Sequence, residues 1–176
     1  MPGEFSPGAL LEVLLRHGVR FVVIGGMAAL AHGSPFPTED VDITPDAGAD
    51  NIDRLSAALR ELDARIRVDD TDAQLPFNHD AASLAAATVW NLTTRFGDLD
   101  ISLAPSGTQG YADLARDATN VPAYGLVVPF ASLADIVRSK QAANRLKDQR
   151  VLPVLRQILA ARFDGTRETD SPGARA

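Results

Sequence analysis

Two aspartates one residue apart, Asp40 and Asp42, stand in a short apolar strand pattern. Side chains at positions i and i+2 of a strand point to the same side, so these two carboxylates repel each other unless a cation or a proton intervenes. Carboxylate oxygens suit Mg²⁺, which also binds phosphate oxygens and water. For an isolated pair, the ordinary alternative is that Asp40 begins the strand and Asp42 faces solvent.

A third acid, Asp100, lies between two apolar residues in a later strand pattern. A carboxylate in such surroundings is unfavourable unless it has a partner or a function. Asp98 shares its face of the strand, but it fits the turn of a hairpin that the pair Gly97-Asp98 predicts. We therefore predict that Asp100 joins the aspartate pair in one metal site.

The double glycine Gly25-Gly26 ends one strand pattern and begins a short helical pattern. Backbone amides at a helix N-terminus bind anions, and glycine lets a phosphate approach the backbone closely. A tight turn without a ligand is the alternative. The chain lacks the G-x-G-x-x-G and Walker patterns, which argues against dinucleotide and P-loop sites. A glycine turn followed by D-x-D and a later acid is what metal-assisted phosphoryl or nucleotidyl transfer requires.

Charge is unevenly distributed along the chain, whose formal net charge is −6. Residues 37–72 hold eleven acids and four arginines, whereas residues 131–163 hold seven bases and two acids. The first segment predicts a region that needs cations and the second a region that meets an anion, with two solvated faces as the alternative. Five of the bases surround a predicted helix–loop–helix junction: Arg138, Lys140, Arg145, Lys147 and Arg150. Among these, Lys140 is expected to contact phosphate.

Hydrophobic periodicity predicts the elements that must position these residues. Strand patterns cover residues 20–24, 41–44, 65–68 (as an edge strand), 88–96, 99–103 and 121–128. Helical patterns cover residues 7–18, 26–32, 51–62, 111–118, 133–143 and 148–163, the last interrupted or kinked at Pro153. Residues 69–80 are expected to form a polar loop, and the pattern of 83–87 does not decide between helix and strand.

The order of these elements predicts an α/β (α+β) protein with a small mixed β-sheet flanked by helices. The 176 residues are expected to form a single domain over 1–163, with a helical C-terminal part at about 131–163 and a disordered tail over 164–176. The lack of cysteine excludes disulfides and zinc–thiolate sites. No apolar run reaches membrane-span length and no signal-peptide pattern is present, so we expect no membrane association and a cytoplasmic location.

Taken together, Gly25-Gly26, Asp40-Val41-Asp42 and Asp100 resemble the signature of the DNA polymerase β-like nucleotidyltransferase superfamily. The segment SLADIVRSKQAANRLKDQRVLPVLRQIL narrows the resemblance. Its Lys-x-x-Ala-x-Arg-x-Lys-Asp pattern is similar to that of the AbiEii/MenT-like nucleotidyltransferase toxins of toxin–antitoxin systems. The resemblance covers residues 20–160 and implies the nucleotidyltransferase fold.

The resemblance implies a role for each residue of these motifs. Asp40 and Asp42 would hold the metal ions, two Mg²⁺, and Asp100 would complete the site and help to activate the attacking hydroxyl. The other roles concern the NTP: the Gly25-Gly26 backbone would hold the triphosphate, Lys140, Arg145 and Lys147 would bind the nucleotide, and Asp148 would orient Lys140 or the base.

The resemblance also implies a reaction. Members of the group transfer a nucleotide from an NTP, here a pyrimidine (CTP or UTP), to the 3′ acceptor end of tRNA. This blocks aminoacylation and translation, and a cognate antitoxin neutralises the toxin. Transfer to a protein hydroxyl (AMPylation), transfer to a small molecule and a catalytically inactive partner-binding module remain alternatives. Two departures stand out: Gly26 replaces the commoner serine, and the loop 34–38 lacks an arginine found in many relatives.

Overall fold

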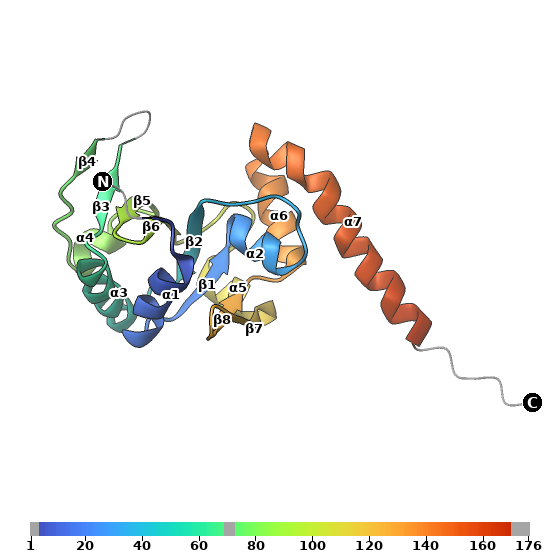
Figure 1. Ribbon diagram of the computed structural model, residues 1–176, viewed down its shortest axis with the longest axis horizontal. Coiled ribbons are helices and arrows are strands. Elements are labelled where there is room, and N and C mark those ends of the chain that lie inside the picture. Colours follow the sequence, from blue (N-terminus) through green and yellow to red (C-terminus); the bar gives the residue numbers. More distant parts are fainter. Residues whose placement is uncertain (1–3, 69–72, 170–176) are drawn as a thin grey trace, which may run out of the picture.

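A computed structural model describes residues 4–68 and 73–169, with side chains up to residue 163. Its strands are β1 (Phe21–Ile24), β2 (Asp40–Pro45), β3 (Arg65–Arg67), β4 (Gln74–Leu75), β5 (Val89–Thr94), β6 (Gly97–Ser102), β7 (Thr119–Ala123) and β8 (Leu126–Phe130). Within the described residues they form one mixed sheet in the order β4-β3-β5-β6-β2-β1-β8-β7 (Figure 1). β2 runs antiparallel to β1 but parallel to β6, so segments distant in sequence lie side by side at the centre of the sheet.

Helices flank this sheet. They are α1 (Pro7–Arg16), α2 (Gly25–Ala31), α3 (Ala49–Glu61), α4 (Ala81–Ala85), α5 (Tyr111–Asp117), α6 (Leu133–Ala143) and α7 (Leu146–Thr169). α2 packs on β1 and β2, and α6 packs on both α2 and α7. The C-terminal helices therefore lie beside the glycine turn that begins α2. Within the described residues, no helix combines the length and apolar character that crossing a bilayer requires.

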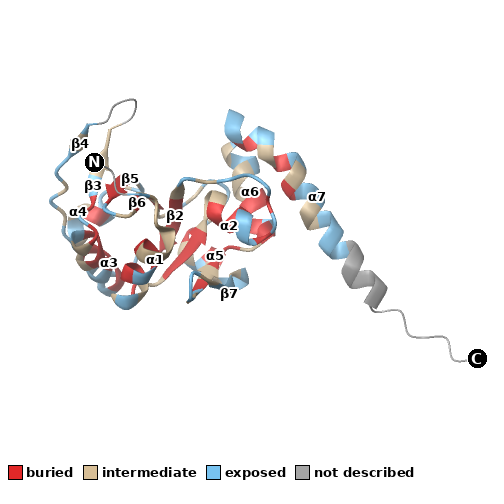
Figure 2. Cartoon of the chain, viewed as in Figure 1, coloured by how far each residue is buried: buried red, intermediate tan, exposed pale blue. Residues whose placement is uncertain are grey.

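The core explains how the acidic strand is held in place (Figure 2). In β2, the fully buried Val41 and Ile43 alternate with the half-buried Asp40 and Asp42. Burial of the two aliphatic side chains, each a gain of about 1.5–3 kcal/mol, anchors the strand. Because successive side chains of a strand point to opposite faces, the same anchoring turns both acids toward the other side.

The turn of the β5–β6 hairpin differs from the predicted one. The Thr94 hydroxyl accepts a hydrogen bond from the Phe96 amide and donates one to the Gly97 carbonyl, which places the turn at Arg95-Phe96. Gly97, with a φ of 109°, begins β6. Asp98 therefore lies within a strand, and its predicted place in the turn is wrong.

The polar segment predicted as a loop over 69–80 contains a strand. β4 pairs with the outer side of β3, so the prediction that 65–68 is an edge strand is wrong. The undecided segment 83–87 begins as part of α4, where the Asp80 carboxylate accepts from the Ser83 amide and the Ser83 hydroxyl accepts from the Asp80 amide. Such reciprocal bonds stabilise a helix start. Residues 69–72 lie outside the described residues.

The last helix is longer than predicted. Pro153 lies inside α7, which continues past it, so the predicted interruption is wrong. α7 runs to Thr169, into the segment predicted as a disordered tail, while residues 170–176 lie outside the described residues. Leu152 and Leu155 are buried, whereas the following turns carry mainly exposed residues (Figure 2). Arg162 still donates a hydrogen bond to the His32 carbonyl.

Candidate active site

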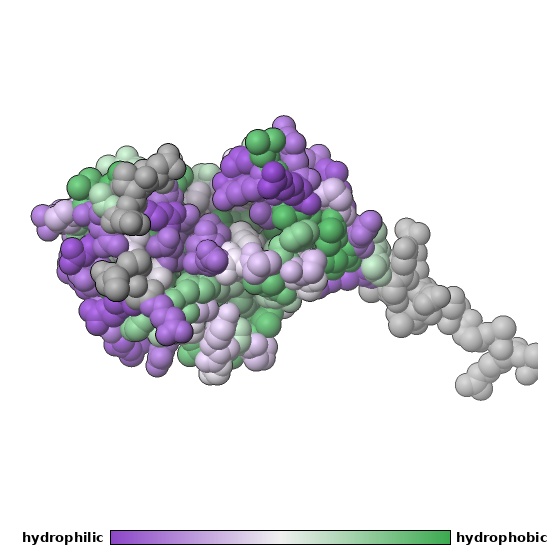
Figure 3. Space-filling view, turned by 45° about the horizontal axis from the view of Figure 1, so that its top comes forward, coloured by the Kyte–Doolittle hydropathy of each residue, from purple (hydrophilic) through white to green (hydrophobic). Residues whose placement is uncertain are grey.

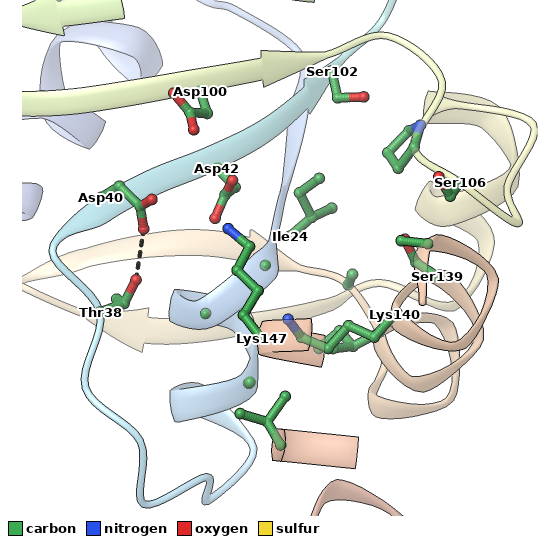
Figure 4. Close-up of a pocket in the computed structure, with 18 of the residues that line it drawn as sticks. Ile24, Thr38, Asp40, Asp42, Asp100, Ser102, Ser106, Ser139, Lys140 and Lys147 are labelled. Carbon is green, nitrogen blue, oxygen red and sulfur yellow. Dashed lines mark hydrogen bonds between the residues drawn. The ribbon is translucent and has the colours of Figure 1, made fainter. Parts of the chain in front are cut away.

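The three predicted metal-binding carboxylates meet on neighbouring strands (Figure 4). The parallel register of β2 and β6 pairs Asp42 with Asp100. One oxygen of each of Asp40, Asp42 and Asp100 lies within 4.8 Å of the other two. The alternation within one strand accounts for Asp40 and Asp42, but only the pairing of two strands brings Asp100 to them.

Gly25 is required by the position of Asp42. Its φ is 64°, a conformation that residues with side chains rarely adopt. A Cβ at this position would also lie 2.0 Å from Asp42 Oδ2. The sequence suggested that this glycine admits a phosphate; in the structure it first of all admits the carboxylate that β2 presents beside it.

Burial and mutual repulsion make it unfavourable for all three carboxylates of the cluster to be charged at once. Burial first, and then the neighbouring carboxylates of Asp40 and Asp100, raise the pKa of Asp42 to about 7, against the opposing effect of Lys147 and Lys140. Without a cation, a proton on Asp42 is the way in which the cluster limits its repulsion near neutral pH. Within the described residues, neither Asp40 nor Asp42 forms an ion pair.

The donor set fits a divalent cation of the Mg²⁺ type. The cluster offers oxygen ligands only, and such hard ligands suit Mg²⁺ better than softer metals. Neither histidine nor cysteine joins it among the described residues. Two unpaired acids that share a half-buried site supply the negative charge that a cation would neutralise.

Arg67 on β3 is a member of the site that sequence reasoning missed. Its guanidinium lies 2.7 Å from Asp100 Oδ1 and 2.8 Å from Asp98 Oδ2. Asp98 also accepts a hydrogen bond from the Thr93 hydroxyl at 2.8 Å. Burial raises the pKa of Asp100, and Arg67 opposes that shift. The alternation of side chains along 65–68 predicts that Arg67 and Arg65 lie on one face of the strand. Only the strand order β3-β5-β6 shows that the acids on that face are Asp98 and Asp100.

A second charged group lies at the junction of α6 and α7. The fully buried Asp148 carboxylate lies 2.7 Å from Arg145 Nε and 3.3 Å from Lys140 Nζ. It also accepts a hydrogen bond from the Arg145 backbone amide, which closes the start of α7. Burial alone would raise the pKa of Asp148, but the ion pairs with Arg145 and Lys140 prevail and lower it. Asp148 therefore has its partners within the chain and holds Lys140 in place.

Lys147, at the start of α7, reaches from this junction toward the acids. Figure 4 shows its amine directed toward Asp42. Within the described residues it has no ion-pair or hydrogen-bond partner, and it is exposed. The alternation of helix faces separates Lys147 from its neighbour Asp148, so one residue points outward to the acids while the other is buried.

The acids and the junction face a common cavity of about 720 Å³. All predicted site residues except the buried Asp148 line it: Gly25, Gly26, Asp40, Asp42, Asp100, Lys140, Arg145 and Lys147. Hydroxyl side chains missed by sequence reasoning line it too: Ser102, Ser106 and Ser139, from β6, the following loop and α6. Hydrophilic side chains also gather on the outer surface over the start of α7 (Figure 3). The cavity therefore has an acidic wall formed by the aspartates, a basic wall formed by the α6–α7 junction, and a third part lined by serine hydroxyls.

Comparison with known proteins supports the fold. No protein-family model matches the chain, and no curated protein matches it. The chain is similar to the lincomycin-bound lincosamide antibiotic adenylyltransferase LnuA, with a TM-score of 0.55 and 16% identity over 85% of this chain and 94% of that one. It is also similar to the antibiotic-resistance factor ANT(2″)-Ia in solution, with a TM-score of 0.51 and 14% identity over 93% and 96%. The predicted fold class, a mixed sheet flanked by helices, is confirmed.

Proposed function

We propose that the protein is a metal-dependent nucleotidyltransferase. The observation that carries this proposal is the convergence of Asp40, Asp42 and Asp100 within 4.8 Å, at the wall of a cavity that Lys140 and Lys147 also line. Acids that hold cations, with amines placed to meet phosphates, form the combination that transfer from an NTP needs.

The residues divide the work of the reaction. Asp40, Asp42 and Asp100 would hold Mg²⁺, which when bound stabilises negative charge on the attacking and leaving oxygens. Lys147 and Lys140 would bind phosphate oxygens of the NTP in the cavity that the Gly25-Gly26 turn also lines. An acceptor hydroxyl oxygen then bonds to the α-phosphorus, the bond to the pyrophosphate oxygen breaks, and pyrophosphate leaves. Asp100 orients the acceptor hydroxyl and draws its proton.

For the acceptor, we propose the 3′ end of tRNA, with a pyrimidine NTP as the donor. The resemblance of the segment from Lys140 to Asp148 to toxin sequences supports this choice. The exposed Arg145, Lys147 and Arg150 beside the cavity suit a polyanionic acceptor. On this proposal the protein is a toxin that blocks aminoacylation, and an antitoxin is its partner.

A small hydroxyl-bearing molecule is the second candidate acceptor. It is favoured by the likeness of the fold to LnuA, which was solved with lincomycin bound. The hydroxyl-lined part of the cavity, formed by Ser102, Ser106 and Ser139, offers hydrogen bonds to a polar molecule. Both candidates use the same acids and the same leaving group, so they differ only in what enters the cavity opposite the NTP.

One experiment tests the reaction and separates the acceptors. The full chain is incubated with Mg²⁺ and each of the four α-labelled NTPs, together with total RNA, protein extract or a panel of hydroxyl-bearing antibiotics. We expect pyrophosphate release and label at tRNA 3′ ends, with Asp42→Asn inactive. Label on an antibiotic or on protein instead would overturn the tRNA proposal. No pyrophosphate release with any acceptor would overturn nucleotidyl transfer itself.

A further inference from the structure

Thr38 lies near the end of the loop between α2 and β2, beside the candidate metal site. Its hydroxyl donates a hydrogen bond of 2.6 Å to Asp40 Oδ1 (Figure 4). Both side chains are half-buried and line the cavity. Within the described residues, this bond is the one that the Asp40 carboxylate forms. Thr38 therefore controls the orientation of a candidate ligand that Arg67, which binds Asp98 and Asp100, does not reach.

Gly26 provides the space in which Thr38 sits. A Cβ at position 26 would lie 2.7 Å from Thr38 Oγ1 and 2.9 Å from Thr38 Cβ. Unlike Gly25, Gly26 does not have a positive φ, so the backbone does not demand glycine there. The two glycines are thus needed for different reasons: Gly25 admits Asp42, and Gly26 admits Thr38.

We propose that Thr38 is a positioning residue of the metal site and that Gly26 exists to admit it; this inference rests on the proposed function. The hydrogen bond holds Asp40 in the rotamer in which it faces Asp42 and Asp100. A carboxylate that is held before the cation arrives loses less side-chain freedom on binding and ligates more tightly. The same hydroxyl occupies the place beside position 26 where a serine side chain would otherwise lie.

This assignment makes positions 26 and 38 interdependent. Gly26→Ser alone forces Thr38 aside and disturbs Asp40. Thr38→Gly alone leaves Asp40 without its donor. The double variant Gly26→Ser/Thr38→Gly removes both close contacts, with Thr38 Oγ1 and with Thr38 Cβ, and returns a hydroxyl to the vacated space, so the effects of the two substitutions are not additive.

The test measures binding of Mn²⁺ alone to the full chain, by electron paramagnetic resonance of the unbound ion. We expect Thr38→Val, which keeps the shape but loses the hydroxyl, to weaken Mn²⁺ binding by about 10-fold or more, and Thr38→Ser to stay within about 2-fold. The double variant should bind more tightly than either of its single variants. The melting temperature without metal, together with circular dichroism, shows that each variant is folded, and Thr38→Ala replaces Thr38→Val if the latter is not.

The outcomes separate this proposal from the proposed function. If the wild-type chain binds Mn²⁺ and both Thr38→Val and Thr38→Ala bind it equally well, the positioning role is overturned and the metal site stands. If the wild-type chain binds Mn²⁺ no better than Asp42→Asn does, the metal site fails, and with it the positioning role. If Gly26→Ser binds as tightly as the wild type, Gly26 does not serve Thr38.

Discussion

The acids on β2 and β6 and the junction of α6 and α7 are two charged regions on opposite walls of one cavity. At the junction, the buried Asp148 carboxylate is neutralised by Lys140 and Arg145 within the chain. On the strands, Asp40 and Asp42 lie together with no cationic partner among the described residues, and the pKa of Asp42 rises to about 7. The buried acid of the first region therefore has cationic partners within the chain, whereas two acids of the second region have none among the described residues.

This difference separates structural from functional charges. A buried charge that has its partners supports the fold, because removing one partner leaves the other uncompensated. A cluster of like charges opposes the fold unless a ligand arrives, and it is retained only where binding or chemistry needs it. We therefore assign the acids and Lys147 to the reaction, and Asp148 to the position of Lys140 and the start of α7.

The largest effect is expected at the acids. Asp42→Asn should lower nucleotidyl transfer by at least about 10³-fold, because a charge that holds the cation is lost. Without metal, the same variant should be at least as stable as the wild type at neutral pH, since one of three like charges is removed. Pyrophosphate release and urea unfolding measure the two quantities. A variant that is both inactive and strongly destabilised would place Asp42 with the structural charges.

Asp148→Asn should act in the opposite way, through stability. It leaves Lys140 and Arg145 short of their buried partner, which costs about 3 kcal/mol in the free energy of unfolding. The value lies at the low end for a broken buried pair because the Arg145 side chain is 57% exposed and finds water. Urea unfolding measures the change, with the exposed Arg150→Gln on the same helix as the control. A fully stable Asp148→Asn that has lost activity would instead make Asp148 functional.

Lys147→Met should weaken the use of NTP with little effect on the fold. A charge-assisted hydrogen bond to phosphate is worth about 1.5–3 kcal/mol, so kcat/KM should fall by roughly 10–100-fold. Thermal unfolding should be unchanged, because Lys147 has no partner among the described residues. Lys140→Met is the matched comparison, since it should lower both the activity and the melting temperature. If the two variants lost activity and melting temperature to the same extent, the division between the outward-pointing Lys147 and the ion-paired Lys140 would be contradicted.

The last effect depends on pH. The pKa of Asp42 is raised to about 7 in the folded protein from an ordinary value of 3.8. Between these values the folded state holds a proton that the unfolded state releases, so rising pH lowers stability by up to about 1.4 kcal/mol per pH unit from this group. Asp42→Asn should remove this contribution, so the difference between the two unfolding curves isolates it. A pH-independent difference would mean that neither burial nor the neighbouring carboxylates raise the pKa of Asp42.

Local patterns predicted more of the fold than of the site. Alternation within 41–44 was enough to place Asp40 and Asp42 on one side, because a strand has a period of two. The hydrophobic periodicity of residues 7–18 predicted α1, and that of residues 148–163 predicted most of the described length of α7. The misplaced turn before Asp98 shows where local rules fail: the Thr94 hydroxyl decided it through two hydrogen bonds that composition does not reveal.

By itself, the sequence determined the types of most elements, the shared face of Asp40 and Asp42, and the basic character of 131–163, since each of these depends on neighbours along the chain. Only the tertiary structure decided that β6 runs beside β2 in parallel register, that Arg67 reaches Asp98 and Asp100, and that Gly26 makes room for Thr38. Each of these contacts joins segments whose spacing is set by the packing of the whole sheet, and no local period encodes that spacing.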